Sequence, residues 1–185
     1  MPITAKEFAA DAEPAAVRQA LARLAKAGKL RRIRRGLYER PRSHPIMGRT
    51  PSNPLAVVES MMKARHAPWQ VSGAYAANLL GLSEQVPTQL IIKTTARVPP
   101  VILGNTRIKF ARVAPSSMAG SGHQAGLVVQ AVRYLGPTGM TPARVERLRQ
   151  QLKPAAIREL KKLIPNLPIS IQPVLKDIVS APKKP

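Results

Sequence analysis

The chain has 185 residues, with 30 lysines and arginines against 9 acids, so its formal net charge is +21. An excess of one sign on this scale favours an anionic partner, of which nucleic acid is the most common. The absence of cysteine excludes disulfides and thiolate metal sites, and no apolar run approaches the roughly 18 residues that a membrane-spanning helix needs.

The first residues show no charged segment followed by an apolar one, so we expect no signal peptide. Together with the missing cysteines and the lack of a long apolar run, this predicts a cytoplasmic protein that does not use a membrane. The positive charge is spread along the sequence, and 44% of the residues are hydrophobic, which is enough for real cores.

The first predicted element is a short helix over residues 5–10. Thr4 is a capping residue and Glu7 follows three positions later, the spacing of a capping box. Phe8 is expected to point into the core.

A second helix is predicted from Pro14 to residue 27, because proline is favoured at the first helical position. Val17, Leu21 and Leu24 recur at helical spacing and form one apolar stripe, and Gly28 favours the end of the helix. The opposite face is small, polar and basic, and it carries Ala15, Arg18, Gln19, Ala22, Arg23 and Lys26. Among these, Arg18, Gln19 and Arg23 are the types that read guanine and adenine.

Residues 29–42, KLRRIRRGLYERPR, hold seven lysines or arginines and a single acid, Glu39. Strands are predicted over residues 30–34 and 36–39, with the turn at Gly36. A charge run is often only a solvated face, but this one is nearly of one sign and rich in arginine, which makes bidentate contacts with phosphate and guanine. We expect DNA contacts from Arg31, Arg32, Arg34, Arg35, Arg40 and Arg42.

A helix followed by a basic hairpin is typical of a winged helix-turn-helix, which places a helix in the major groove and a wing on the phosphates. Residues 41–54 carry four prolines and little periodicity, which indicates an irregular connection. The predicted organisation is a winged helix-turn-helix domain at 1–42, a linker at 43–54, a mixed α+β domain at 55–180 and a basic tail at 181–185. The fold class is therefore α+β, with helices at the C-terminal end.

In the second part, strands are predicted over residues 90–94, 98–103 and 107–113. Helices are predicted over residues 55–65, 72–80 and 126–135, and again after Pro142 and Pro154. The last stretch, 167–185, is proline-punctuated and ends in a basic tail. The last two helices present a second basic surface, which consists of Arg144, Arg147, Arg158, Lys161 and Lys162. This surface fits a solvated face, a second DNA contact or an interface with an acidic partner.

The sequence offers little for catalysis. The three histidines have no metal-ligand spacing, and the nine acids form no short paired motif. Residues 119–122 are glycine-rich but follow no clear strand, so they indicate a surface loop, with His123 at a helix start. We expect neither an enzyme nor a metal or cofactor.

The segment VRQALARLAKAGKLRRIRRGLYERPR resembles the head of the AbiEi-type antitoxins of bacterial abortive-infection systems. The later stretches SGAYAANLLGLSEQVP, TRIKFARVAP and VVQAVRYLG are similar to the body of one branch of that family, so the resemblance runs from about residue 4 to residue 152. None of these motifs is catalytic, and it is their order that makes the resemblance specific.

This resemblance implies an N-terminal winged helix that binds an operator, expected to be an inverted repeat, and represses its own operon. It also implies a C-terminal domain that counteracts a neighbouring nucleotidyltransferase toxin, as a type IV pair that needs no stable complex. By position, the recognition helix would use Ala15, Arg18, Gln19, Ala22 and Arg23, and the wing would use Arg32, Arg34 and Arg35.

Two alternatives remain open. In one, the chain is a protein-interaction antitoxin whose basic surface binds an acidic partner or the toxin. In the other, it is an RNA-binding protein that protects the toxin's target. Aromatic residues make up only 3% of the chain, which disfavours recognition of single strands by base stacking.

Overall fold

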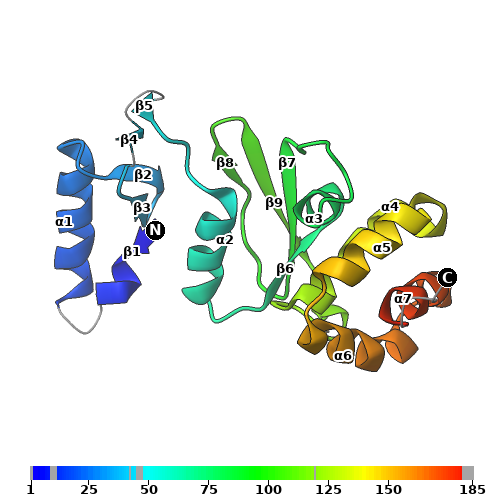
Figure 1. Ribbon diagram of the computed structural model, residues 1–185. Helices are drawn as coiled ribbons and strands as arrows, with labels where there is room; N and C mark the ends of the chain where they lie inside the picture. The colour runs from blue at the N-terminus through cyan, green and yellow to red at the C-terminus, as the bar shows by residue number, and fades with distance from the viewer. Residues whose placement is uncertain (1, 9–11, 42, 45–47, 119, 181–185) are drawn as a thin grey trace. The chain divides into compact units, whose positions relative to one another are not determined.

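The computed structural model describes residues 2–8, 12–41, 43–44, 48–118 and 120–180. It is a mixed α+β protein, as expected, and it separates into two compact units (Figure 1). The first unit comprises Met1–Ala67 with Pro100–Ile108, and the second comprises Pro68–Pro99 with Lys109–Pro185. The predicted linker and the helix that follows it lie within the first unit in this division.

A three-stranded antiparallel sheet forms the centre of the first unit. Its strands are β1 (Pro2–Thr4), β2 (Arg31–Arg34) and β3 (Leu37–Glu39), in the order β1-β3-β2. The hairpin β2–β3 confirms the two predicted strands to within a residue at each end. Strand β1 was not predicted, and it pairs with β3 through Ile3 opposite Tyr38.

The turn after β1 is a short 3₁₀-helix, η1 (Ala5–Phe8), where a longer helix was expected. The capping pair is present, because Glu7 Oε1 accepts hydrogen bonds from Thr4 N at 3.0 Å and from Thr4 Oγ1 at 3.1 Å. The prediction that Phe8 points inward is wrong, since 37% of its surface is exposed. The remaining residues of that predicted helix, 9 and 10, lie outside the described residues.

Helix α1 (Pro14–Lys26) confirms the predicted second helix, with proline in its first turn. Val17 and Leu21 are buried and form an apolar cluster with Tyr38 of the hairpin. Leu24 was expected to continue this stripe but is 39% exposed. The apolar cluster holds α1 against one face of the sheet, which makes helix and hairpin one packed body.

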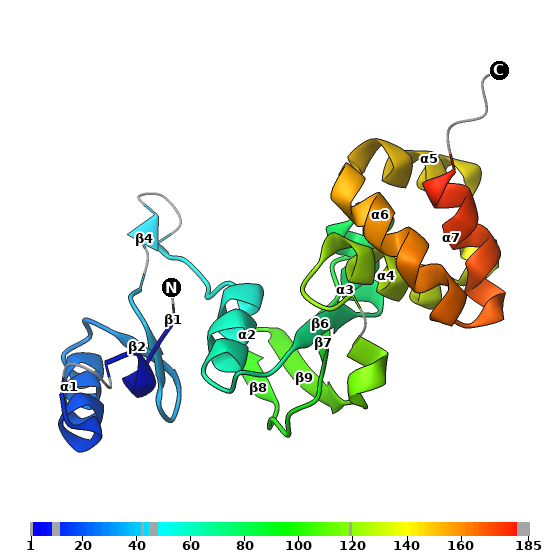
Figure 2. The ribbon, with the colours of Figure 1, turned by 90° about the horizontal axis from the view of Figure 1, so that it is seen from below.

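Helix α2 (Pro54–Lys63) covers the opposite face of the same sheet, so the sheet lies between α1 and α2 in both views (Figures 1 and 2). Asn53 caps α2, accepting from Leu55 N at 2.9 Å, and Ser60 Oγ donates to the carbonyl oxygen of Pro2 at 3.4 Å. The short strands β4 (Ser43–His44) and β5 (Gly48–Arg49) pair with each other before α2 begins.

Strand β2 contains one residue more than the partner stretch of β3. The register pairs Arg32 with Tyr38 and then Arg34 with Leu37, so Ile33 is the extra residue of a β-bulge. Directly paired residues lie on the same face of a sheet. The bulge therefore places Arg34 on the face of Leu37, away from α1, whereas Arg32 shares the face of Tyr38.

The strands β6 (Trp69–Ser72), β7 (Gln89–Thr94), β8 (Val101–Leu103) and β9 (Thr106–Arg112) form a second sheet, in the order β6-β7-β9-β8. Strands β7 and β9 confirm the predicted strands at 90–94 and 107–113, and β8 forms only the second half of the one predicted at 98–103. Residues 72–80 were predicted as one helix, but the segment starts in β6 and becomes helical only at α3 (Ala74–Leu79). Gly73, with a φ of 67°, permits this change of direction.

The helices α4 (Gln124–Gly139), α5 (Pro142–Gln151), α6 (Pro154–Leu163) and α7 (Gln172–Val179) belong to the second unit. The first three match the predicted helices in position. Helix α7 was missed, because its Pro173 and the preceding Pro168 indicated a break, whereas Pro173 lies in the first turn of the helix, where proline is tolerated. Leu148, Leu160 and Leu175, one from each of α5, α6 and α7, are fully buried.

The glycine-rich segment before α4 packs closely against the helix. Gln70 of β6 is buried, and its Oε1 accepts from Gly122 N at 3.2 Å. A Cβ on Gly126 would lie 2.2 Å from the carbonyl oxygen of Gly120. The segment thus has a packing role that its composition did not indicate, and His123 occupies the position before α4, as expected.

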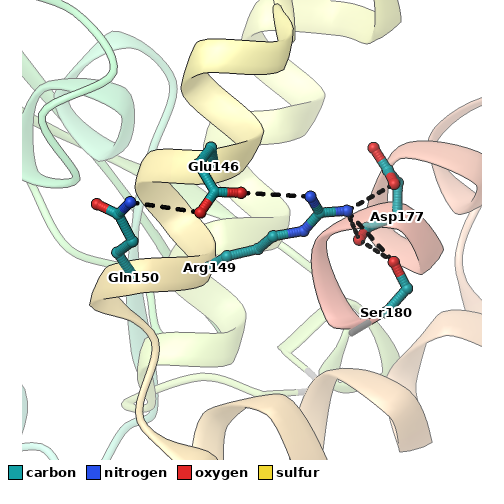
Figure 3. A network of polar contacts seen from close by, with 5 residues as sticks. All are labelled: Glu146, Arg149, Gln150, Asp177 and Ser180. Atoms are coloured by element: carbon teal, nitrogen blue, oxygen red, sulfur yellow. Dashed lines mark hydrogen bonds and ion pairs between the residues drawn. The ribbon is translucent and has the colours of Figure 1, made fainter. Parts of the chain in front are cut away.

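Arg149 connects α5 to α7, and its partners are shown in Figure 3. Its Nη2 donates to Asp177 Oδ1 and to the Asp177 carbonyl oxygen, both at 2.8 Å, and to Ser180 Oγ at 3.3 Å. Its Nη1 lies 3.4 Å from Glu146 Oε2. The Arg149 side chain is 19% exposed and that of Asp177 is 59% exposed. Because solvent weakens the attraction between exposed charges, the several hydrogen bonds of the guanidinium contribute more to this contact than the ion pair does.

We expect Arg149→Lys to lower the free energy of unfolding by about 1–2 kcal/mol, because the single ammonium group of lysine cannot make all the hydrogen bonds that the two Nη atoms of arginine make here. Urea titration followed by circular dichroism measures the change. Arg158→Lys is the matched control, since Arg158 is exposed on α6. Equal stabilities of the two variants would contradict this role of Arg149.

Candidate nucleic-acid interface

The predicted DNA-contacting face of α1 is open to solvent. All six of its predicted residues are exposed: Ala15, Arg18, Gln19, Ala22, Arg23 and Lys26. The helix itself contains no acid. Its buried side is fixed by Val17 and Leu21, so packing alone determines which face remains available to a partner.

The hairpin arginines differ in their surroundings. Arg32 and Arg35 are exposed, Arg34 is half-buried, and Arg40, after the hairpin, is exposed. Gly36 has a φ of 78°, in the left-handed region that favours glycine, and it completes the turn after Arg35. Arg42 lies outside the described residues.

Arg31 has partners within the protein. Its Nη2 forms an ion pair with Glu39 Oε1 and donates to Ser52 Oγ at 2.8 Å, and Ser52 Oγ donates to the same carboxylate oxygen at 2.9 Å. Glu39 is buried. Because this buried carboxylate neutralises Arg31, we leave Arg31 out of the contact set that we propose below.

Arg34 has the least favourable electrostatic surroundings of the hairpin arginines described in the structure. Its Nη1 is buried and has no hydrogen-bond partner among the described residues. Burial lowers the pKa of its guanidinium, and the nearby charge of Arg65 lowers the pKa further. Arg65 follows α2, and its Nη1 donates to the carbonyl oxygen of Met61 at 2.9 Å.

These two arginines belong to a cavity of about 440 Å³ in the first unit. Arg18 of α1, Arg34 of β2, Arg35 of the turn and Arg65 line this cationic cavity, together with apolar side chains that include Leu37 and Met61. The structure thus brings three predicted residues together with one that the sequence did not single out. Arg65 lies far from the basic stretch 29–42 in the sequence. The bulge at Ile33, which places Arg34 on the same side as Arg65, has no recognisable sequence pattern.

The predicted C-terminal basic surface divides into two groups. Arg144 and Arg147 of α5 donate to carbonyl oxygens, Arg144 Nη1 to Gly139 and Arg147 Nη1 to Gly81, each at 2.5 Å. Arg158, Lys161 and Lys162 are exposed on α6, at a spacing that gathers them on one side of the helix. Arg144 and Arg147 of α5 thus support the second unit, and α6 carries the exposed cations of this group.

The described residues contain no group of three or more histidines and acids placed to hold a metal ion. Over the same ranges, no helix has both the length and the apolar character required to cross a bilayer.

Two comparisons relate the chain to other proteins. The crystal structure of the RV2827C protein from Mycobacterium tuberculosis superposes with a TM-score of 0.50 at 16% sequence identity, covering 98% of this chain and 73% of that one. At this identity the likeness concerns the fold alone. No curated protein matches the chain. Residues 3–160 match the Family of unknown function (DUF6088). The match spans most of the chain, which therefore belongs to the DUF6088 family.

Proposed function

We propose that the first unit binds duplex DNA as a winged helix-turn-helix, and that the chain is an autorepressor and antitoxin of the AbiEi type. The observation that carries this proposal is the exposed face of α1, which is free of acids and is held by the apolar cluster beside an arginine-rich hairpin. A fixed arrangement of cations suits a duplex, whose phosphates are themselves fixed.

In this proposal α1 enters the major groove. Gln19, Arg18 and Arg23 face the base edges, with the small side chains of Ala15 and Ala22 allowing close approach. The remaining cations contact phosphates on either side, and they are Lys26, Arg32, Arg34, Arg35 and Arg40. Such contacts position the protein, whereas the helix supplies the sequence preference.

The second unit carries the protective function in the proposal. It counteracts a nucleotidyltransferase toxin encoded beside it, without a stable complex. Arg158, Lys161 and Lys162 are exposed cations on one side of α6, and they suit an acidic or phosphate-bearing partner.

A binding assay on the promoter of the chain's own operon tests the DNA-binding part. We expect Gln19→Ala to weaken operator binding by about 1–3 kcal/mol and to leave binding to unrelated duplexes unchanged, because a base contact is lost and phosphate contacts remain. Fluorescence anisotropy at fixed salt measures both affinities.

Arg107→Gln serves as the control, since Arg107 is exposed on β9 and outside the proposed contact set. Equal loss on both duplexes would remove Gln19 from base readout. Tighter binding to structured RNA, or to an acidic protein, than to any duplex would favour the alternatives. Expression beside the neighbouring toxin gene tests protection, which the wild-type chain must provide and a chain lacking the second unit must not.

A further inference from the structure

The cationic cavity has features that a groove-binding surface does not require. It is lined by elements from four separate parts of the first unit: the β1–η1 segment, α1, the β2–β3 hairpin and the end of α2. Four arginines, Arg18, Arg34, Arg35 and Arg65, line it, and no aspartate or glutamate is among the described residues that do so. Its volume of about 440 Å³ falls within the roughly 300–1,000 Å³ typical of small-molecule sites.

The charges in this cavity are not balanced by the protein. The pKa of the Arg34 guanidinium is lowered by burial and by Arg65, so the folded chain holds two like charges near each other at a cost. The Arg34 Nη1 atom is buried without a partner among the described residues. Buried donors in native proteins nearly always have a partner, which here can be an ion.

The acid nearest to the cavity along the chain does not supply that partner. Glu7 is exposed, and its Oε1 accepts from the backbone nitrogen and the hydroxyl of Thr4, a residue that lines the cavity. Glu39 is paired with Arg31 and Ser52, and the exposed Glu13 and Glu59 do not line the cavity. The cavity therefore keeps a net positive charge.

We infer that the cationic cavity is a phosphate site, in which Arg34 and Arg65 together clamp a phosphate group and Arg18 and Arg35 complete its neutralisation. Planar guanidinium groups match phosphate oxygens with paired hydrogen bonds. The apolar side chains of Leu37 and Met61 provide contact for the organic part of a phosphorylated compound. Arg18, Arg34 and Arg35 also belong to the proposed DNA contact set, and Arg65 alone lies outside it. The competition experiment below therefore decides whether the phosphate belongs to DNA.

The first experiment uses inorganic pyrophosphate and the full chain, in a phosphate-free buffer with ionic strength matched by sodium chloride. At about 100 times its dissociation constant, we expect pyrophosphate to raise the melting temperature by about 5–10 °C. Isothermal titration calorimetry should give one site per chain. A melting temperature equal to that in the chloride control would overturn the phosphate site.

Variants decide whether the cavity is responsible. Arg65→Gln and, separately, Arg35→Gln should each weaken pyrophosphate binding at least tenfold, whereas Arg107→Gln, with the same loss of charge on β9, should leave it within twofold. Arg35 is exposed at a turn, so its replacement tests the cavity even where Arg65→Gln disturbs folding. Equal loss in all three variants would indicate general charge attraction and overturn the assignment.

A competition experiment identifies the source of the phosphate. Displacement of a labelled duplex by pyrophosphate, together with weaker duplex binding by Arg65→Gln, assigns the site to a backbone phosphate of DNA. Simultaneous binding of pyrophosphate and duplex assigns it to a free phosphorylated compound. Pyrophosphate binding without any duplex binding would retain the phosphate site and reject the proposed function, so the two can fail separately.

Discussion

Replacing both Arg34 and Arg35 with alanine is expected to weaken duplex binding by about 10- to 100-fold near 100 mM salt, whatever the DNA sequence. The two side chains lie at the tip of the β2–β3 hairpin, Arg35 exposed and Arg34 half-buried. Each phosphate contact that is lost retains one counterion on the DNA. The slope of log K against log salt should therefore become shallower by about two units.

Measurement of the dissociation constant between about 50 and 200 mM salt gives that slope directly. The matched control is the double variant Arg107→Ala, Lys109→Ala, which removes the same charge from exposed positions of β9. If the control lowers affinity and slope as much as the hairpin variant does, the hairpin has no specific role and only net charge matters.

Gly126→Ala is expected to lower the free energy of unfolding by about 2–3 kcal/mol, although glycine to alanine normally stabilises a helix by about 1 kcal/mol. The added Cβ would lie 2.2 Å from the carbonyl oxygen of Gly120 and 2.9 Å from Gln70 Oε1. Neither neighbour can move easily, because Gln70 is buried and its Oε1 accepts a hydrogen bond from Gly122 N. Removing the steric clash therefore requires movement of the glycine-rich loop or of α4.

Tryptophan fluorescence during urea unfolding reports this effect, because Trp69 is the only tryptophan and lies in β6 of the second unit. Ala143→Gly at an exposed position of α5 calibrates the local helix preference and should cost about 1 kcal/mol. If the Gly126→Ala variant is as stable as the wild type, the segment around Gly120 can move to make room for the added Cβ at no cost in stability.

The sequence predicts elements well where short-range chemistry defines them. Helix α1 is set by Pro14 at its start, Gly28 after its end and the buried pair Val17 and Leu21. Strands β2 and β3 follow from the apolar residues Leu30, Ile33, Leu37 and Tyr38 on either side of the Gly36 turn. These patterns involve residues close together in the sequence, so they predict the helix and the two strands without information about the rest of the fold.

Elements that depend on distant partners were missed. Strand β1 has three residues, and only pairing with β3 makes it a strand. Phe8 and Leu24 are exposed because the apolar cluster closes around Tyr38, which no helical pattern can show. Arg65 belongs to the cationic cavity only because α2 covers the face of the sheet opposite α1.

The extra residue in β2 also determines where the hairpin can change its length. Loss of Ile33 would leave a regular ladder, in which Arg34 still pairs with Leu37, Arg32 with Tyr38 and Arg31 with Glu39. Strand β3 has no such extra residue, because all three of its residues are paired and buried. Loss of one residue from β3 would turn the remaining side chains of the strand to the other face, so a deletion there is more damaging than a deletion at Ile33.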